Sequence, residues 1–173
     1  MSKNKKKWTG TNLESLMDML ASKDVASRKK ARKSLVAMGK QAIPSLTRAL
    51  QNSKSDHLRW EAAKTLGAIG DVRAIPSLVK ALEDSDIDVV WLAAEALRKF
   101  KKAAWSALLH ALIKNGEDSV QLRNGAHHVF RNQKEDGFND LLTNLLLALK
   151  SSAAAELTTI AANEILKRMR KKS

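Results

Sequence analysis

The sequence contains two nearly identical nine-residue segments, AIPSLTRAL at residues 42–50 and AIPSLVKAL at residues 74–82. Proline suits the first position of a helix, because its missing N–H would be unpaired there anyway and its φ is already helical. The isoleucine before each proline is expected to be extended. After each proline, leucine and alanine recur at i, i+3 and i+4, which is helical spacing. Each copy therefore predicts a short amphipathic helix that begins at Pro44 or Pro76.

The residues that precede each copy repeat as well. RKKARKSLVAMG at 28–39 aligns with RWEAAKTLGAIG at 59–70, and VWLAAEALRKF at 90–100 follows the same frame. Gly39 and Gly70 stand where a helix should end, since glycine takes a left-handed conformation at little cost. Each unit therefore reads as helix A, a tight turn, helix B and a polar turn. A single unit cannot bury both apolar faces, so the copies are expected to stack.

Extending the frame predicts an all-α fold, a right-handed α-solenoid of about ten antiparallel helices, with four helix pairs and capping half-repeats. We expect one domain at 12–170, after a flexible basic tail at 1–11 and before a basic tail at 171–173. Its parts are a half-repeat at 12–21, repeats at 24–52, 55–84, 86–114 and 118–150, and a C-terminal capping helix at 152–170.

The pattern R-x-x-A-x-x-x-L-x-x-x-G followed by A-I-P-x-L-x-x-A-L resembles the HEAT-like repeats of the phycobilisome-lyase type. The likeness is strongest from Arg59 to Leu82. The third unit departs from the pattern, because it has Val90 in place of the arginine and lacks the glycine and the proline. The resemblance implies that B helices line a concave face and A helices a convex one. It also implies, as one alternative function, an accessory role in tetrapyrrole (bilin) attachment.

The formal net charge of +13 is concentrated at the two ends of the 173-residue chain. Residues 1–40 hold eleven lysines and arginines against three acids, and residues 165–173 hold five and none, whereas residues 41–164 carry fifteen of each sign. A neutral middle weakens the case for a continuous nucleic-acid groove. No apolar stretch is long enough for a membrane span, and the basic start lacks a signal-type apolar region, so we expect a cytoplasmic protein without a membrane partner.

Residues with catalytic or metal-binding chemistry are sparse. Cysteine is absent, and the four histidines show no H-E-x-x-H spacing. In the family that the chain resembles, some enzymes bind iron through His-Glu pairs. This chain contains no His-Glu dipeptide, so the resemblance does not imply that activity here. We therefore expect no enzyme activity, no metal and no cofactor.

The equivalent B-helix positions predict a ridge of polar and basic side chains. Because neighbouring helices pack about 8–10 Å apart, one residue from each unit should line up along the concave face. Spaced cations beside small side chains suit an acidic or extended peptide. The predicted ridge consists of Ser45, Arg48, Ser77, Lys80 and His110.

Two further clusters are candidate binding sites. Trp60 and Trp91 are 31 residues apart and hence equivalent, which predicts a possible outer-face patch. A group of five cations within six residues is a possible anion or nucleic-acid patch. These cations are Arg28, Lys29, Lys30, Arg32 and Lys33.

The sequence thus favours a non-enzymatic, monomeric adaptor that binds another protein on the concave face of the solenoid. The alternative from another class is a nucleic-acid binder that uses its basic N-terminal and C-terminal clusters.

Overall fold

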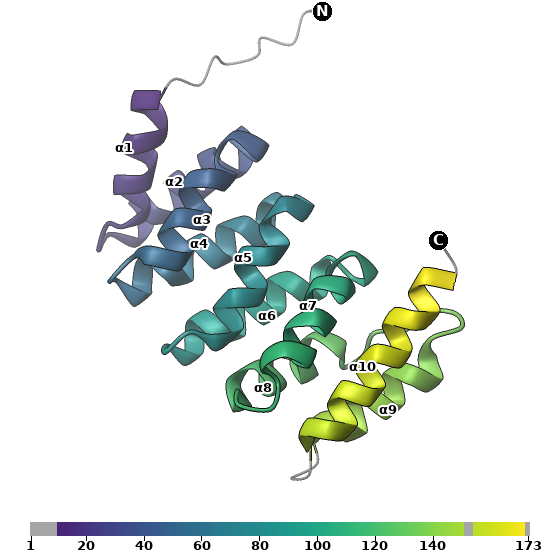
Figure 1. Cartoon of the computed structure of the whole chain (residues 1–173). Coiled ribbons are helices and arrows are strands. Elements are labelled where there is room, and N and C mark those ends of the chain that lie inside the picture. Colours follow the sequence, from purple (N-terminus) through teal and green to yellow (C-terminus); the bar gives the residue numbers. More distant parts are fainter. Residues whose placement is uncertain (1–9, 151–153, 172–173) are drawn as a thin grey trace, which may run out of the picture.

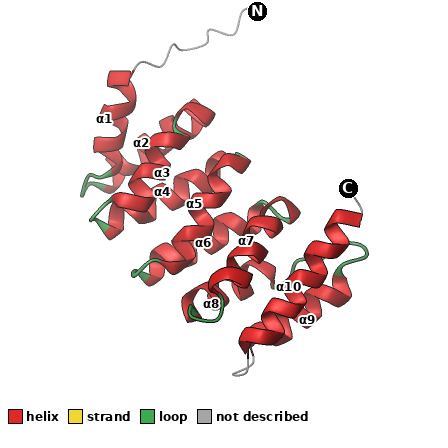
Figure 2. Ribbon diagram, viewed as in Figure 1, coloured by secondary structure: helices red, strands yellow, loops and turns green. Residues whose placement is uncertain are grey.

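The computed structural model describes residues 10–150 and 154–171, which fold entirely into helices and connections with no strand (Figure 2). The all-α prediction and the expected ten helices are confirmed. The α-helices are α1 (Gly10–Leu20), α2 (Val25–Met38), α3 (Ile43–Asn52), α4 (Asp56–Ile69), α5 (Ile75–Lys80), α6 (Ile87–Lys99), α7 (Lys102–Asn115), α8 (Val120–Phe130), α9 (Asn139–Lys150) and α10 (Ala154–Lys171). Short 3₁₀ segments are η1 (Gly39–Gln41), η2 (Val72–Ala74) and η3 (Ala81–Glu83).

Each A helix starts at a short polar side chain that accepts hydrogen bonds from the first turn. The carboxylate of Asp24 accepts from two backbone N–H groups of α2, and Asp86 does the same for α6. Ser55 and Ser119 serve as the equivalent caps of α4 and α8. Such caps satisfy N–H groups that have no partner within the helix.

The B helices α3 and α5 begin one residue earlier than the sequence indicated. Ile43 and Ile75 are themselves the first helical residues, and each proline lies in the first turn. Ile75 is fully helical, with φ −54° and ψ −49°, so the expectation of an extended isoleucine is wrong. The physical reason is that a 3₁₀ turn, η1 or η2, leads directly into the helix and holds the isoleucine in helical geometry.

The turn between the A and B helices reverses through one residue with positive φ in all four units. Gly39 and Gly70 have φ of 62° and 69°, and the same column continues with Lys101 at 51° and Asn132 at 66°. These positions are spaced by 31 residues each time. The third and fourth units therefore keep the positive φ of this turn although neither has a glycine there.

The helices stack in chain order into two layers (Figure 1). The A helices α2, α4, α6 and α8 pack one on the next, while α3, α5 and α7 form the B layer. The last two helices differ from the expected order, because α9 packs against α8 and α10, and α10 packs against α7. Hence α9 extends the A layer and α10 completes the B layer, which the long connector after α8 permits.

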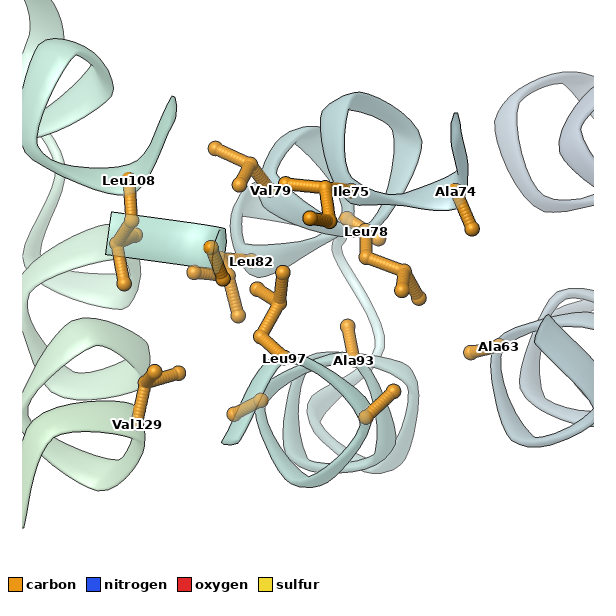
Figure 3. Close-up of a cluster of buried hydrophobic side chains, with 14 of the residues drawn as sticks. Ala63, Ala74, Ile75, Leu78, Val79, Leu82, Ala93, Leu97, Leu108 and Val129 are labelled. Atoms are coloured by element: carbon orange, nitrogen blue, oxygen red, sulfur yellow. The ribbon is translucent and has the colours of Figure 1, made fainter. Parts of the chain in front are cut away.

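The core is a continuous column of alanine and branched aliphatic side chains between the layers. Leu78 and Leu82 point from the B side towards Ala93 and Leu97 of α6 (Figure 3). Leu66, in the central α4, is also fully buried. Because each unit buries its apolar face on its neighbours, the layers are held mainly by apolar burial.

In the first two complete units, an arginine ties the unit to the end of the preceding one. Arg28 donates to the carbonyls of Ser22 and Lys23, and Arg59 donates to the carbonyl of Ser53. Arg59 also forms a two-bond ion pair with Asp84, with nitrogen–oxygen distances of 2.8 Å. The hydrogen bonds that Arg59 donates to Asp84 raise the pKa of Arg59 above its ordinary value. These arginines satisfy helix-end carbonyls that would otherwise lack partners.

Helices α4 and α6 approach through small residues. A Cβ atom added at Gly67 would lie 2.6 Å from the Cβ of Ala96. Replacing Gly67 by alanine should therefore push the two helices apart and lower the free energy of unfolding by about 1–3 kcal/mol, despite the better helix propensity of alanine. Urea unfolding measures this change.

The matched control is Gly67→Ala combined with Ala96→Gly, which removes the clashing Cβ atom. A double-mutant cycle should show favourable coupling between the two changes. If Gly67→Ala alone stabilised the fold by its helix propensity, the close packing of α4 and α6 described above would be wrong.

Candidate partner-binding surface

Three of the predicted ridge residues are exposed on the B-helix face, which is formed by α1, α3, α5, α7 and α10. Arg48, Lys80 and His110 come from the successive helices α3, α5 and α7, and all three are exposed. Ser45 of α3 is half-buried beside Arg48. The Nδ1 atom of His110 donates to the carbonyl of Ser106 at 2.7 Å, which fixes the ring and leaves Nε2 turned away from that bond.

Ser77 departs from the predicted ridge. It is only 3 % exposed, and its hydroxyl donates to the carbonyl of Ala74 at 2.8 Å. The hydroxyl of Thr47, on the neighbouring helix α3, lies 3.4 Å from the same atom. Ser77 therefore links two B helices, and its hydroxyl is engaged within the protein, unlike the exposed side chains of Arg48 and Lys80.

The B-helix face contains a groove of about 560 Å³ at its N-terminal end, between α1 and α3. Its apolar lining comes from Leu13 and Met17 of α1, Ala49 of α3 and Leu58 of α4. Leu13, Met17 and Leu58 are only half-buried, although they pack on the core. The groove is therefore a place where apolar side chains remain partly accessible next to the predicted ridge.

Polar groups surround this apolar lining. Arg48 and Ser45 line one side on α3, and Glu14 lines the groove from α1. Within residues 10–150 and 154–171, neither Arg48 nor Glu14 takes part in a salt bridge. An apolar groove with a few convergent polar groups is the usual form of a recognition site. Arg48 can form a two-bond contact with a carboxylate, since guanidinium donors are arranged as a fork.

The two tryptophans of the predicted outer-face patch lie on adjacent A helices. Trp91 of α6 is 54 % exposed, and its ring centre is 6.1 Å from that of His128. Trp60 of α4 is half-buried and stacks on His57, with ring centres 5.5 Å apart. One turn before Trp91, Ile87 is 73 % exposed, which gives the outer face a second apolar side chain there. Of the two tryptophans only Trp91 is exposed, and both aromatic rings already contact neighbouring histidines.

The repeat pattern and the stacked helix pairs can now be compared with known families. A family model described as HEAT repeats matches residues 13–98, and a second, overlapping match covers residues 49–124. The chain belongs to the HEAT-repeat family. A comparison with curated proteins found no match. HEAT repeats are generally scaffolds for protein interactions, and their helical fold is typically non-catalytic.

The basic cluster at the start of the HEAT stack is partly used inside the protein. Arg28 and Arg32 both donate to the carboxylate of Glu61, which is 2 % exposed. Lys29, Lys30 and Lys33 are exposed and form no salt bridge within the described residues, whereas Arg28 and Arg32 are held by Glu61. Five cations within six residues repel one another, and the carboxylate of Glu61 from the next HEAT unit offsets part of this repulsion.

Metal-ligand clusters and membrane-spanning helices are both absent from residues 10–150 and 154–171. No group of three or more histidine, aspartate or glutamate side chains in this part of the chain could hold a metal ion. Among the same residues, no helix combines the length and apolar character that crossing a bilayer requires. Much of the predicted N-terminal tail, residues 1–9, and residues 172–173 of the C-terminal tail lie outside the described residues.

The groove residues were missed from the sequence, although a signal existed. Leu13 and Met17 are one helical turn apart on the half-repeat, and this spacing places both side chains on one apolar face of a helix. The contribution of Leu58 from α4 could not be read from the sequence, since in the repeat frame it belongs to an A helix.

Proposed function

We propose that this HEAT-repeat protein is a monomeric, cytoplasmic adaptor that binds a protein partner on its B-helix face. The observation that carries the proposal is the groove between α1 and α3, where apolar side chains stand beside the unpaired Arg48. The preferred occupant is an extended acidic segment that places an apolar side chain against Leu13 and Met17 and a carboxylate against Arg48. Lys80 and His110 continue the positive ridge along α5 and α7.

This proposal accounts for the surface better than the outer-face alternative. A partner gains most from burying apolar groups that are partly exposed in the free protein and from pairing a charge that is otherwise unpaired. The groove offers both. On the outer face, by contrast, Trp60 already stacks on His57, and Trp91 contacts His128. A nucleic-acid function that relies on the basic N-terminal cluster is supported less, because Arg28 and Arg32 are paired with Glu61.

The test is capture of the partner by the purified protein and by the variant Arg48→Glu. The variant should weaken binding by about 2 kcal/mol, roughly 30-fold, because an interfacial arginine that pairs with a carboxylate is a typical hot spot. The matched control is Lys40→Glu, which makes the same charge change at an exposed residue of η1 outside the groove. Mass spectrometry after nuclease treatment identifies what is captured, and titration of that protein measures the affinity.

The rival surface is tested with Trp60→Ala combined with Trp91→Ala. Retained binding by this double variant together with loss in Arg48→Glu supports the groove. The opposite result, retention in Arg48→Glu and loss in the tryptophan variant, would place the partner on the outer face. Loss of all captured material after nuclease treatment would instead favour nucleic acid as the ligand.

A further inference from the structure

A second cavity lies on the opposite half of the molecule, at the turn edge of the third and fourth units. It has a volume of about 400 Å³ and is lined by the α6–α7 turn and by the connector that follows α8. Of its eight lining side chains five are cationic and one, Glu135, is anionic. The cations are Arg98, Lys101, Lys102, Arg131 and Lys134. All five cations belong to residues 41–164, a segment whose net charge is zero.

Two of the five cations are neutralised within the protein. Lys102 pairs with Glu135 at 2.9 Å, and Arg98 pairs with Glu95 at 3.0 Å. Burial acts to raise the pKa of Glu95, but the hydrogen bond with His128 and the charge of Arg98 outweigh it and hold the pKa below its ordinary value. Lys101 and Arg131 take part in no salt bridge within the described residues. A positive excess therefore remains at the cavity.

Lys101 occupies a backbone position that suits glycine. Its φ is 51° and its ψ is −136°, close to the 62° and −128° of Gly39 in the first unit. A residue with a Cβ atom is strained in this region, and a bulky one is a genuine outlier. The same turn in the first two units carries glycine. The third unit thus accepts backbone strain and places a lysine at the cavity.

The connector on the other side of the cavity is held in place by Gln133. Its amide nitrogen donates to the carbonyls of Val129 at 3.1 Å and Arg98 at 3.3 Å, and its amide oxygen accepts from Nε1 of Trp105 at 2.9 Å. These three bonds connect α6, α7 and the connector. The cations are therefore mounted on two turns that are fixed relative to each other, which reduces the ordering cost of ligand binding.

We infer that this cavity binds a small ligand that carries two or more adjacent phosphate groups. Lysine and arginine are the side chains that recognise phosphate oxygens, and an arginine can contact two of them at once. The first turn of α7, to which Lys102 belongs, adds the positive end of a helix dipole at the same place. A volume of about 400 Å³ exceeds what a single phosphate needs and suits an oligophosphate.

The surroundings favour a small oligophosphate over a nucleic-acid strand. The eight lining residues include no aromatic ring on which a base could stack. A strand also needs a basic track several phosphates long, whereas two of the five cations here are already paired with Glu95 and Glu135. The inference concerns a different edge of the molecule from the groove at α1 and α3, and its outcome does not depend on the adaptor proposal.

Calorimetric titration of the full chain with inorganic tripolyphosphate tests the inference, at low and at physiological ionic strength. Arg131→Gln should weaken binding by roughly tenfold or more, since an ionic contact to phosphate is lost. Lys114→Gln is the matched control, because Lys114 is an exposed lysine of α7 that does not line the cavity, and it should change the affinity less than about twofold.

Lys101→Gly separates the site from the stability of the fold. It should weaken tripolyphosphate binding by about tenfold. It should also raise the melting temperature by about 2–4 °C, because glycine relieves the strained turn. Equal affinity of Lys101→Gly, Arg131→Gln and the unmodified protein would overturn the inference. A short single-stranded DNA that binds more tightly than tripolyphosphate, and is lost with Arg131→Gln, would overturn the assignment to a small ligand.

Discussion

Replacing Leu66 by alanine is expected to lower the free energy of unfolding by about 2–5 kcal/mol. Leu66 lies in the central helix α4 and is fully buried among side chains of neighbouring units. The truncation removes apolar contacts and leaves a cavity that tightly packed helices fill only in part. Urea unfolding followed by circular dichroism measures the loss as a lower midpoint at unchanged slope.

Val72→Ala is the control for Leu66→Ala. Val72 lies in η2, only a short distance along the chain, but it is 57 % exposed and should change stability by no more than about 0.5 kcal/mol. A loss below half a kilocalorie for Leu66→Ala would mean that Leu66 is not a core residue. The register of the whole repeat frame would then be wrong, because Leu35 and Leu97 are assigned to the same column.

Replacing Trp105 by alanine should lower the free energy of unfolding by about 3–5 kcal/mol. The indole is 1 % exposed and contacts Phe130 and Phe138 edge to face, with ring centres 5.9 and 5.7 Å apart. Its N–H also donates to Gln133, so the variant loses packing and a hydrogen bond together. Thermal or urea unfolding measures the effect.

Two further variants show how much of this loss of stability comes from the hydrogen bond of Trp105 and how much from its burial. Trp105→Phe keeps most of the ring packing but leaves the amide oxygen of Gln133 without its donor, which should cost about 1–3 kcal/mol. Trp91→Ala, at a residue that is 54 % exposed, should cost no more than about 0.5 kcal/mol. If Trp91→Ala destabilised the fold as much as Trp105→Ala, the division between an exposed and a buried tryptophan would fail.

The repeat frame in the sequence was sufficient to predict the helices, because each depends on local signals. Spaced apolar residues and polar caps at the starts of the A helices act within one or two turns. The prediction of extended isoleucines failed for a local reason as well, since the rule for residues before proline was overridden by the 3₁₀ turns that lead into α3 and α5.

The pairing of charges could not be predicted in the same way. Glu61 lies 33 residues after Arg28 and 29 after Arg32, so only the stacking of α2 on α4 brings them together. For the same reason a count of charges along residues 41–164 concealed the cationic cavity, whose members come from two turns. The location of Lys101 in the turn could nevertheless be predicted, because Lys101 follows Gly70 by one repeat of 31 residues.

The sequence did not indicate that α9 would extend the A layer and that α10 would complete the B layer. Their apolar spacing suits either layer, and the connector after α8 is longer than the turns of the earlier units. A longer connector allows α9 to remain on the A side while α10 crosses to pack on α7. The sequence predicts a capping helix at 152–170, where the structure has α10 at Ala154–Lys171, but the neighbours of this helix are set by packing alone.

The contact of Gly67 with Ala96 also determines how the molecule behaves as an elastic body. Helices that touch through a glycine and an alanine have no long side chains at that point to rotate as they slide, so the joint between α4 and α6 is stiff. We therefore expect bending of the solenoid to be concentrated in the helix joints on either side of α4 and α6. The helices α1 to α3, which carry the groove, should then move relative to α9 and α10 about this stiff centre.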